Sequence, residues 1–380
     1  MAAEAGGGGR RAAFVTPFFA DRDAVCNDTY HGARALAARG WETAVFAVGG
    51  TSERATVRPF DDLRKFVRGP EDVVCFHFST GRRDIEEAVA AAPGRKILKF
   101  HNITPPEHFA MWSDDLAEAS RTGRLEMPRV AAMGWEQVWA DSSFNLAEIA
   151  PHLPPGTPAG VIAPFHETDE LLAQPRPPAA AQAMPRLLTV GRVVQSKGHP
   201  FLLRVMRYLV HELGTPAVLD IVGKPDHRLL AYLRMLELMV REFGLERHVR
   251  FHGEITAATL AAHYAGATAF VCASEHEGFC VPLVEAMAFG VPVVALGTTA
   301  VPETVGGAGI VWDERDPRRF AVTLKRLAGN PAERDWLAAQ GRARYAAAFS
   351  NAMIESKVVA AIAAGRPAPP GEAPGESSGG

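Results

Sequence analysis

Two glutamates, Glu277 and Glu285, stand eight positions apart in a single apolar stretch. A strand predicted to end at Cys272 precedes a loop, and Pro282 suits the first turn of the helix that follows. We therefore expect Glu277 in the loop and Glu285 in the first helical turn, both at the carboxyl end of the strand. A carboxylate there can accept two hydrogen bonds from a vicinal diol such as that of ribose. The alternative is that both acids are solvated, because acidic residues suit the start of a helix.

Two cations, Arg192 and Lys197, flank a predicted strand-to-helix turn that follows the apolar run 187–190. Together with the free amides of a helix start, two such cations can hold a diphosphate. The alternative is an ordinary solvated surface. The sequence therefore offers a candidate anion site at the end of a second strand.

Polar residues also follow predicted strands in the first half of the chain. His101 and Asn102 come directly after the run 96–100, and we expect both to project into a cleft. A histidine in such a place is either catalytic or a hydrogen-bonded structural residue. Asp21 and Asp23 form an Asp-x-Asp spacing that could hold a metal-bound nucleotide. A capped turn explains them equally well, so the sequence predicts no metal site.

The elements that must position these residues begin with short apolar runs separated by helical patterns. Such runs indicate a parallel sheet covered on both faces. The predicted strands are 12–19, 43–48, 73–78, 96–100 and 138–140. The predicted helices are 28–39 and 83–92, with another that starts after the N-cap Ser142.

A proline-rich stretch, 151–186, then predicts an interdomain connection. The pattern restarts beyond it with strands at 187–191, 217–223, 248–252, 269–272 and 293–296. Helices are predicted at 199–213, 226–242, 256–265 and 283–289, and the remainder to about 364 is helical.

Two such arrays predict an α/β chain with two Rossmann-like domains that face a central cleft. We place the domains at 11–165 and 166–349, and we expect a helix at 350–365 to pack back on the first. The ends, 1–10 and 366–380, are rich in Ala, Gly, Pro or Ser, so we predict that they are disordered.

The composition of the 380 residues fits a globular protein, with 47% apolar and 22% charged residues. The net charge of −3 gives no reason to expect nucleic-acid binding. We find no apolar run near the roughly 20 residues that span a bilayer and no signal-peptide core. Four widely spaced cysteines suit reduced thiols. We expect a cytoplasmic enzyme with at most peripheral contact with the inner membrane face.

Taken together, these motifs resemble those of the retaining glycosyltransferases of family 4, the group 1 glycosyltransferases. The resemblance rests on Gly191-Arg192 with Lys197, on His101, and on the two glutamates within the run EGFCVPLVEAMAFGVPVVA at 277–295. It covers nearly all of residues 11–365 and implies the GT-B fold of two Rossmann-like domains. The run His-Asn-Ile-Thr-Pro at 101–105 is similar to a branch often linked to cell-surface polysaccharides.

The resemblance also implies residue roles. Arg192 and Lys197 would bind the donor's diphosphate, Glu285 the ribose, and the catalytic residues would be His101 and Glu277. The donor sugar would contact Gly278, Phe279, Cys280 and Val281. The candidates for acceptor binding are Asp23, Asn27, Asn102 and Thr104. Two departures stand out: 23–28 replaces the glycine-rich loop of many members, and Cys280 replaces a glycine, which would tighten the pocket near the sugar.

The expected reaction is transfer of a hexosyl group from a nucleotide sugar to a hydroxyl of a sugar or lipid-linked sugar. By resemblance it proceeds with front-face retention, without a metal or other cofactor, in polysaccharide or glycoconjugate synthesis. A nucleotide-sugar epimerase of the same fold and a non-catalytic nucleotide-sugar-binding protein remain alternatives. An NAD-dependent oxidoreductase is disfavoured because no Gly-x-Gly-x-x-Gly follows a predicted strand. The sequence leaves the nucleotide and the sugar open.

Overall fold

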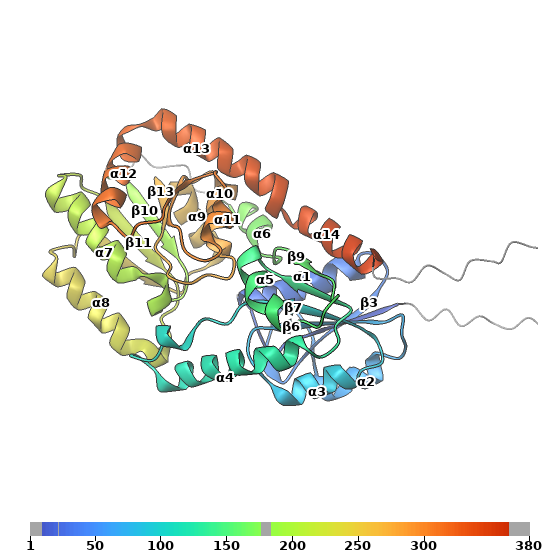
Figure 1. Cartoon of the computed structure of the whole chain (residues 1–380). Helices are drawn as coiled ribbons and strands as arrows, with labels where there is room; N and C mark the ends of the chain where they lie inside the picture. The colour runs from blue at the N-terminus through green and yellow to red at the C-terminus, as the bar shows by residue number, and fades with distance from the viewer. Residues whose placement is uncertain (1–9, 22, 176–183, 365–380) are drawn as a thin grey trace, which may run out of the picture.

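The first sheet of the protein is built from the N-terminal half of the chain (Figure 1). The computed structural model describes residues 10–21, 23–175 and 184–364. Seven parallel strands run in the order β5-β3-β1-β6-β7-β8-β9. They are β1 (Arg11–Val15), β3 (Glu42–Ala47), β5 (Val57–Pro59), β6 (Val73–Phe78), β7 (Arg95–Phe100), β8 (Gln137–Ala140) and β9 (Ala159–Val161). The short strands β2 (Phe18–Ala20) and β4 (Gly49–Thr51) pair separately.

The second sheet has the same order of strands as the first. Its six parallel strands run β12-β11-β10-β13-β14-β15. They are β10 (Arg186–Val190), β11 (Val218–Val222), β12 (Val249–Gly253), β13 (Ala269–Cys272), β14 (Val293–Leu296) and β15 (Ile310–Trp312). In each sheet the winding direction reverses once, between β1 and β6 and between β10 and β13. Ligands of such sheets bind beyond the strand ends at that switch point.

Helices cover both faces of each sheet, which explains why the central strands are apolar throughout. In the first domain α2 (Leu63–Phe66), α3 (Arg83–Ala91) and α4 (Asp114–Ala131) lie on one face. The helices α1 (Ala24–Ala37) and α14 (Asn351–Ala364) lie on the other.

In the second domain one face packs against α7 (His199–Arg207), α8 (Leu230–Glu242) and α12 (Pro317–Gly329). The other face packs against α9 (Ala257–Gly266) and α10 (Val281–Phe289). The remaining helices are α5 (Ser143–Ile149), α6 (Thr168–Leu172), α11 (Val301–Val305) and α13 (Pro331–Arg344).

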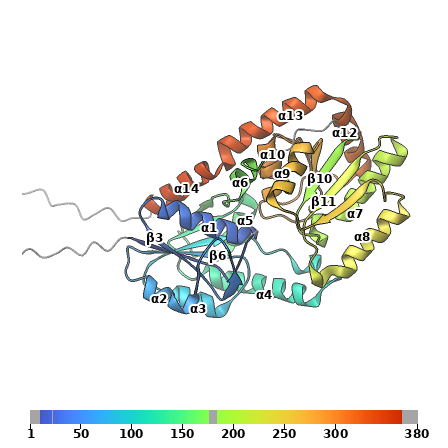
Figure 2. The same cartoon turned by 180° about the vertical axis from the view of Figure 1, so that it is seen from behind.

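The last helical run, Pro331–Ala364, extends along both domains (Figure 2). Its first part, α13, packs on α10, and its last part, α14, packs on α1. Arg95 and Gln137 of the first sheet donate hydrogen bonds to the carbonyls of Ile362 and Ala361, at 2.9 and 2.7 Å. An 18-residue window within this run reaches a mean hydropathy of 1.2 and so meets the length and composition of a membrane span, contrary to our expectation that no apolar run comes close. Helices of soluble proteins often meet the same criteria.

The sequence predicted the α/β class and most central strands, and β6, β13 and β14 have the predicted bounds. Other elements differ from the prediction. The strand 12–19 is divided at Pro17 into β1 and β2, and α1 starts four residues early because Asp23 caps it. The proline-rich connection contains β9 and α6. The polar, 18-residue α4 was missed altogether, as was β15. The predicted disordered ends fall almost wholly outside the described residues, and the domain boundary at 165–166 stays a prediction.

Candidate active site

An ion pair between Lys197 and Glu277 occupies the switch point of the second sheet. Lys197 lies in the turn after β10 and Glu277 in the loop after β13, and their Nζ and Oε1 atoms are 2.6 Å apart. Glu277 is buried, so its interpretation as a solvated loop residue is wrong. Burial disfavours its ionised form, but the Lys197 charge and hydrogen bonds from Ser274 and Cys280 outweigh burial and lower the pKa of Glu277. Both members of the pair are therefore charged at neutral pH.

Glycines allow the backbone segments around this pair to lie close together. Gly198 begins α7 with a φ of 67°, and a Cβ there would lie 2.0 Å from the carbonyl oxygen of Ala273. A Cβ on Gly223, which has a φ of 150°, would lie 1.8 Å from the carbonyl oxygen of Gly191. Only glycine fits such positions. Arg192 is exposed in the same turn, so the two predicted diphosphate ligands share one strand end.

Glu285 belongs to a different environment from that of Glu277. It is the fifth residue of α10, not part of the first turn as predicted, although Pro282 does open the helix. Its carboxylate is buried and accepts a 2.5 Å hydrogen bond from the hydroxyl of Tyr264 on α9. Burial raises the pKa of Glu285 to about 7, and the Tyr264 bond only partly opposes this. The structure thus brings Lys197 and Glu277 together and turns Glu285 toward Tyr264.

Two cysteines line the inner side of the Glu277 loop. Cys272 ends β13, and Cys280 precedes α10 in the left-handed region, with a φ of 72°. Glycine adopts this conformation most easily, so Cys280 stands at a position whose backbone suits the glycine that the resemblance leads us to expect. Ligand atoms of Cys272, Glu277 and Cys280 all lie within 4.8 Å of one another. The Cys280 thiol donates toward Cys272, which lowers the pKa of Cys272 and raises that of Cys280 well above its usual value.

The loop after β13 also contacts the first domain. The carbonyl of Gly278 accepts a 2.7 Å hydrogen bond from Ser142, the N-cap of α5. Nε2 of His276 lies 2.7 Å from Oδ1 of Asn102. A Cβ on Gly278 would lie 2.8 Å from the Cβ of Asn102 and 3.1 Å from the side chain of Asn145. The glycine is therefore needed for this close approach between the domains. Asn102 lies at this contact, and its predicted role in acceptor binding stays a prediction.

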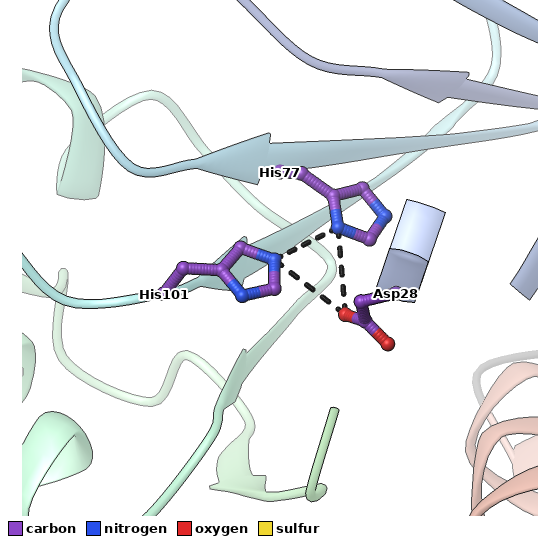
Figure 3. Close-up of side chains that lie close together, drawn as sticks. All are labelled: Asp28, His77 and His101. Carbon is purple, nitrogen blue, oxygen red and sulfur yellow. Dashed lines mark hydrogen bonds and ion pairs between the residues drawn. The ribbon is translucent and has the colours of Figure 1, made fainter. Parts of the chain in front are cut away.

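His101 does not project into the cleft, and that prediction was wrong. Its side chain is 3% exposed and turns into the first domain. Nδ1 lies 2.9 Å from Oδ2 of Asp141, and Nε2 lies 2.8 Å from Nδ1 of His77. Figure 3 shows the rings of His77 and His101 and the carboxylate of Asp28 pointing toward one another. Sequence reasoning missed this because strand positions do not say to which side a strand-end residue turns.

The buried cluster around His101 contains both signs of charge. Nζ of Lys99 forms an ion pair with Oδ1 of Asp141, 2.9 Å away, and both side chains are buried. Burial opposes the charge of Lys99, but Asp141 and Asp28 outweigh it and raise the pKa of Lys99. Burial lowers the pKa of His77 well below its usual value, and the His101 and Lys99 charges add to this. The cluster therefore contains a charged lysine and a neutral His77 at neutral pH.

The remaining predicted residues lie near the start of α1 and the loop after β7. Asp23 accepts hydrogen bonds from the amides of Val25 and Cys26, at 3.0 and 3.2 Å, and so caps α1. Asp21 accepts from Ser52 at 2.7 Å. These contacts support the capped turn over a metal-bound nucleotide. Asn27 and Thr104 are half-buried, as are Gly278 and Val281, whereas Phe279 is buried and packs edge-on against Phe349.

Several residues that shape both switch points were not predicted: Asp28, His77, Lys99, Asp141, Tyr264 and His276. One signal was available. His77 is a polar residue in the otherwise apolar run 73–78, and a polar side chain in a fully buried strand needs a specific partner. Its partners outside its own strand are Asp28 of α1 and His101 in the loop after β7, which no local pattern connects to His77.

The comparison with known protein families concerns the second domain. Residues 184–330 match the family described as "Glycosyl transferases group 1". The D-inositol 3-phosphate glycosyltransferase of Geodermatophilus obscurus is 30% identical over 267 residues, which cover 65% of this chain and 58% of that protein. The GDP-mannose-dependent alpha-(1-6)-phosphatidylinositol monomannoside mannosyltransferase of Mycolicibacterium smegmatis is 30% identical over 210 residues, 53% of each chain. The matches span about half the length of these curated relatives.

Solved structures extend the likeness to the whole fold. Anabaena HepE, solved in complex with UDP, superposes with a TM-score of 0.73 over 93% of this chain and 100% of its own, at 14% identity. Sucrose-phosphate synthase from Thermosynechococcus elongatus gives a TM-score of 0.71 over 93% and 98% of the two chains, at 19% identity. The chain therefore has the GT-B fold, which confirms the predicted fold class.

Proposed function

We propose that the protein is a retaining glycosyltransferase that transfers a hexosyl group from a nucleotide sugar to an acceptor hydroxyl. The observation that carries this is the Lys197–Glu277 pair at the switch point of the domain that matches the group 1 family, the place where such sheets bind nucleotides. The names of the relatives suggest GDP-mannose as a donor to test and inositol phosphates or phosphatidylinositol mannosides as acceptors.

In this proposal the turn after β10 binds the leaving diphosphate. Lys197 and Arg192 supply positive charge, and the starts of α7 and α10 supply free amides and the positive end of the helix dipole. Glu277 and the backbone of Gly278 to Val281 hold the sugar hydroxyls. When a donor binds, Lys197 exchanges part of its contact with Glu277 for phosphate oxygens. Fixed donors of this kind stabilise the developing charge without a metal ion.

The bond between the anomeric carbon and the diphosphate breaks, and a bond from the same carbon to the acceptor oxygen forms on the same face. A phosphate oxygen of the leaving group takes the acceptor proton. The contact of Asn102 with His276 and of Ser142 with Gly278 would bring the domains together and exclude water from the reaction. For His101 we propose a positioning role in the loop that carries Asn102, because its own side chain faces away from Glu277.

The alternatives are supported less well. An epimerase acts on the donor alone, whereas the relatives are named as transferases. A binding protein without activity would not need the buried charge pair. We further propose that the enzyme acts in the cytoplasm on sugar or lipid-linked acceptors, with at most peripheral membrane contact. The four cysteines are free and buried, as suits a reducing compartment.

A two-stage experiment tests the proposal. A thermal-shift panel of GDP-, UDP- and dTDP-sugars identifies the donor, because a ligand at 100 times its Kd stabilises the fold by about 2.7 kcal/mol. Transfer is then assayed with the acceptors above, with and without EDTA, and donor alone tests for epimerisation. We expect retained stereochemistry and a rate that EDTA leaves unchanged. Epimerisation without an acceptor, or donor binding without turnover on any acceptor, would contradict the proposal.

Glu285 has its own test. Glu285→Gln should weaken donor binding if its carboxylate accepts the ribose hydroxyls, and Tyr264→Phe, which removes its present partner, should not. Unchanged affinity of Glu285→Gln for every nucleotide sugar would remove the ribose role and leave the transferase proposal intact.

A further inference from the structure

The switch point of the first sheet contains a second set of converging side chains, independent of the proposed transfer reaction. Asp28 comes from α1, His77 from β6 and His101 from the loop after β7, and the three meet beyond the strand ends (Figure 3). Nδ1 of His77 and Nε2 of His101 are 2.8 Å apart. Oδ2 of Asp28 is 3.5 Å from each of these nitrogens. Three potential ligand atoms thus face one point.

These separations fit a tetrahedral metal ion. With ligand bonds of about 2.0–2.1 Å, two ligand atoms of a tetrahedral zinc site lie roughly 3.3 Å apart. The two Asp28 distances match that value, and the His77–His101 distance needs to lengthen by only a few tenths of an ångström. All three side chains are 5% exposed or less, so the groups are held in place by their surroundings.

The outer contacts of the ligands also suit a metal site. A histidine that binds a metal usually donates its other ring N–H to a carboxylate, a carbonyl or water, which fixes its orientation. Nδ1 of His101 makes this contact with Asp141, whose second oxygen pairs with Lys99. Oδ1 of Asp28 accepts a 2.7 Å hydrogen bond from the amide of Phe165. His101 and Asp28 thus each use one polar atom in a contact within the protein, and the other polar atom of each faces the proposed metal position.

Two buried carboxylate oxygens of this cluster accept no hydrogen bond within the described part of the chain: Oδ1 of Asp141, which pairs with Lys99, and Oδ2 of Asp28. His101 Nδ1–H can donate to Asp141, His77 Nδ1–H can donate to His101, and the Cys75 thiol, 3.6 Å away, can donate to Nε2 of His77. Oδ2 of Asp28 is buried and accepts no hydrogen bond from any described residue. A buried carboxylate oxygen without a partner costs free energy. A cation at the centre of the three atoms removes this cost.

The donor set indicates which cation suits the cluster. Two imidazoles and one carboxylate suit zinc better than magnesium, which prefers oxygen ligands. Asp28 and His77 also line a cavity of about 20 Å³, which is large enough for one water.

We propose that Asp28, His77 and His101 bind a zinc-class divalent metal ion buried in the first domain. The ion ties α1, β6 and the loop after β7 together, and so holds the backbone that presents Asn102 to His276. It is a structural ion and takes no part in diphosphate binding.

A second Asp-His group in the chain provides the control. Ligand atoms of Asp220, His252 and His263 also lie within 4.8 Å of one another. However, Oδ2 of Asp220 already accepts two hydrogen bonds from the guanidinium of Arg186, at 2.8 and 2.5 Å. Oδ2 of Asp220 is therefore already satisfied by hydrogen bonds, unlike Oδ2 of Asp28. His263→Gln should therefore leave any bound metal in place.

The test measures metal content on the full chain, produced without a metal-affinity tag and freed of loose metal by desalting. We expect about one zinc per chain in the wild type and in His263→Gln, and a loss of stoichiometric zinc in Asp28→Asn and His77→Gln. Asp141→Asn should bind zinc roughly 10- to 100-fold more weakly, since it removes only the outer contact of His101. Equal zinc in wild type and His77→Gln would overturn the proposal.

A second measurement does not depend on how the variants fold. Wild-type protein stripped of metal and loaded with Co2+ should show the visible bands of a tetrahedral site with nitrogen and oxygen ligands. A thiolate-to-cobalt charge-transfer band would instead place the metal at Cys272 and Cys280. Absence of any stoichiometric metal, together with a Tm that zinc does not change, would mean that a proton network fills the cluster. Either result would overturn the proposal, whatever the outcome of the transferase assays.

Discussion

The two switch points of this protein share a topology and differ in chemistry. Both sheets have their switch point beside their first strand, yet the second domain places a charge pair at a turn with an exposed cation nearby, whereas the first encloses its charges. Lys197 is 22% exposed in its side chain and Lys99 only 3%. The same position in the fold can therefore hold a partly exposed charge pair in one domain and a buried cluster of charged residues in the other.

The largest expected effect is on stability, in the first domain. Lys99→Met leaves Asp141 and Asp28 buried without their cation, and removal of one partner of a buried pair costs about 3–5 kcal/mol. Chemical denaturation should show this loss in the free energy of unfolding. Lys65→Met is the control, since Lys65 pairs with Asp62 at the surface and should change little. If the two variants are equally stable, the first switch point is not a structural site.

The next effect is on turnover, in the second domain. Lys197→Met should lower the kcat of transfer roughly 100- to 1,000-fold, because one fixed charge at the leaving diphosphate is lost. Its stability loss should be smaller than that of Lys99→Met, because water reaches Lys197. The steady-state rate is compared with that of Lys65→Met. A kcat within twofold of wild type would exclude Lys197 from the reaction.

The pH dependence of stability tests the burial of Glu285 in the second domain. Its pKa is raised to about 7, so between about 4.5 and 7 the unfolded chain releases a proton that the folded chain keeps. The unfolded state then binds fewer protons, and the stability of the wild type falls as pH rises through this range. Glu285→Gln should lack this part of the fall, a difference of roughly 3 kcal/mol. Parallel stability profiles of the two proteins from pH 4 to pH 8 would contradict the assignment.

The contact between the domains should be sensitive to one methyl group. Gly278→Ala places a Cβ 2.8 Å from the Cβ of Asn102, and such overpacking costs about 1–3 kcal/mol. We expect a lower kcat/KM with near-normal folding, because the domains must separate slightly. Gly329→Ala is the matched control, since a Cβ there meets open space. Equal kcat/KM values for the two variants would show that the approach at Gly278 is not needed.

The smallest effect concerns the hydrogen bond between Asn102 and His276. A double-mutant cycle with Asn102→Ala and His276→Ala should give a coupling of about 1 kcal/mol in kcat/KM, typical of one hydrogen bond. Additive effects would mean that the two residues act separately.

His101→Ala should lower Tm more than it changes the affinity for donor, since its side chain belongs to the buried cluster.

The sequence was sufficient for the fold class and for naming candidate ligands at the second switch point, but not for their contacts. Lys197 and Glu277 lie in short motifs whose turn and helix signals are local, so each could be placed after a strand, whereas their ion pair and the bond from Tyr264 to Glu285 could not. The cluster of Asp28, His77 and His101 could not be predicted, because its members come from three elements and turn inward. The helix α4 was missed because it is polar overall and contains Pro128.

The location of α14 has a consequence for synthesis on the ribosome. The first sheet has all its strands once residue 161 has been made, but α14, which covers part of one face, consists of residues 351–364. Ile354, Val358 and Ile362 are buried in a cluster with Trp139 and Ile97 of that sheet. Until residues 351–364 have been made, this apolar surface has no cover from α14, so the nascent protein should depend on chaperones for longer than a protein whose domains close one after the other.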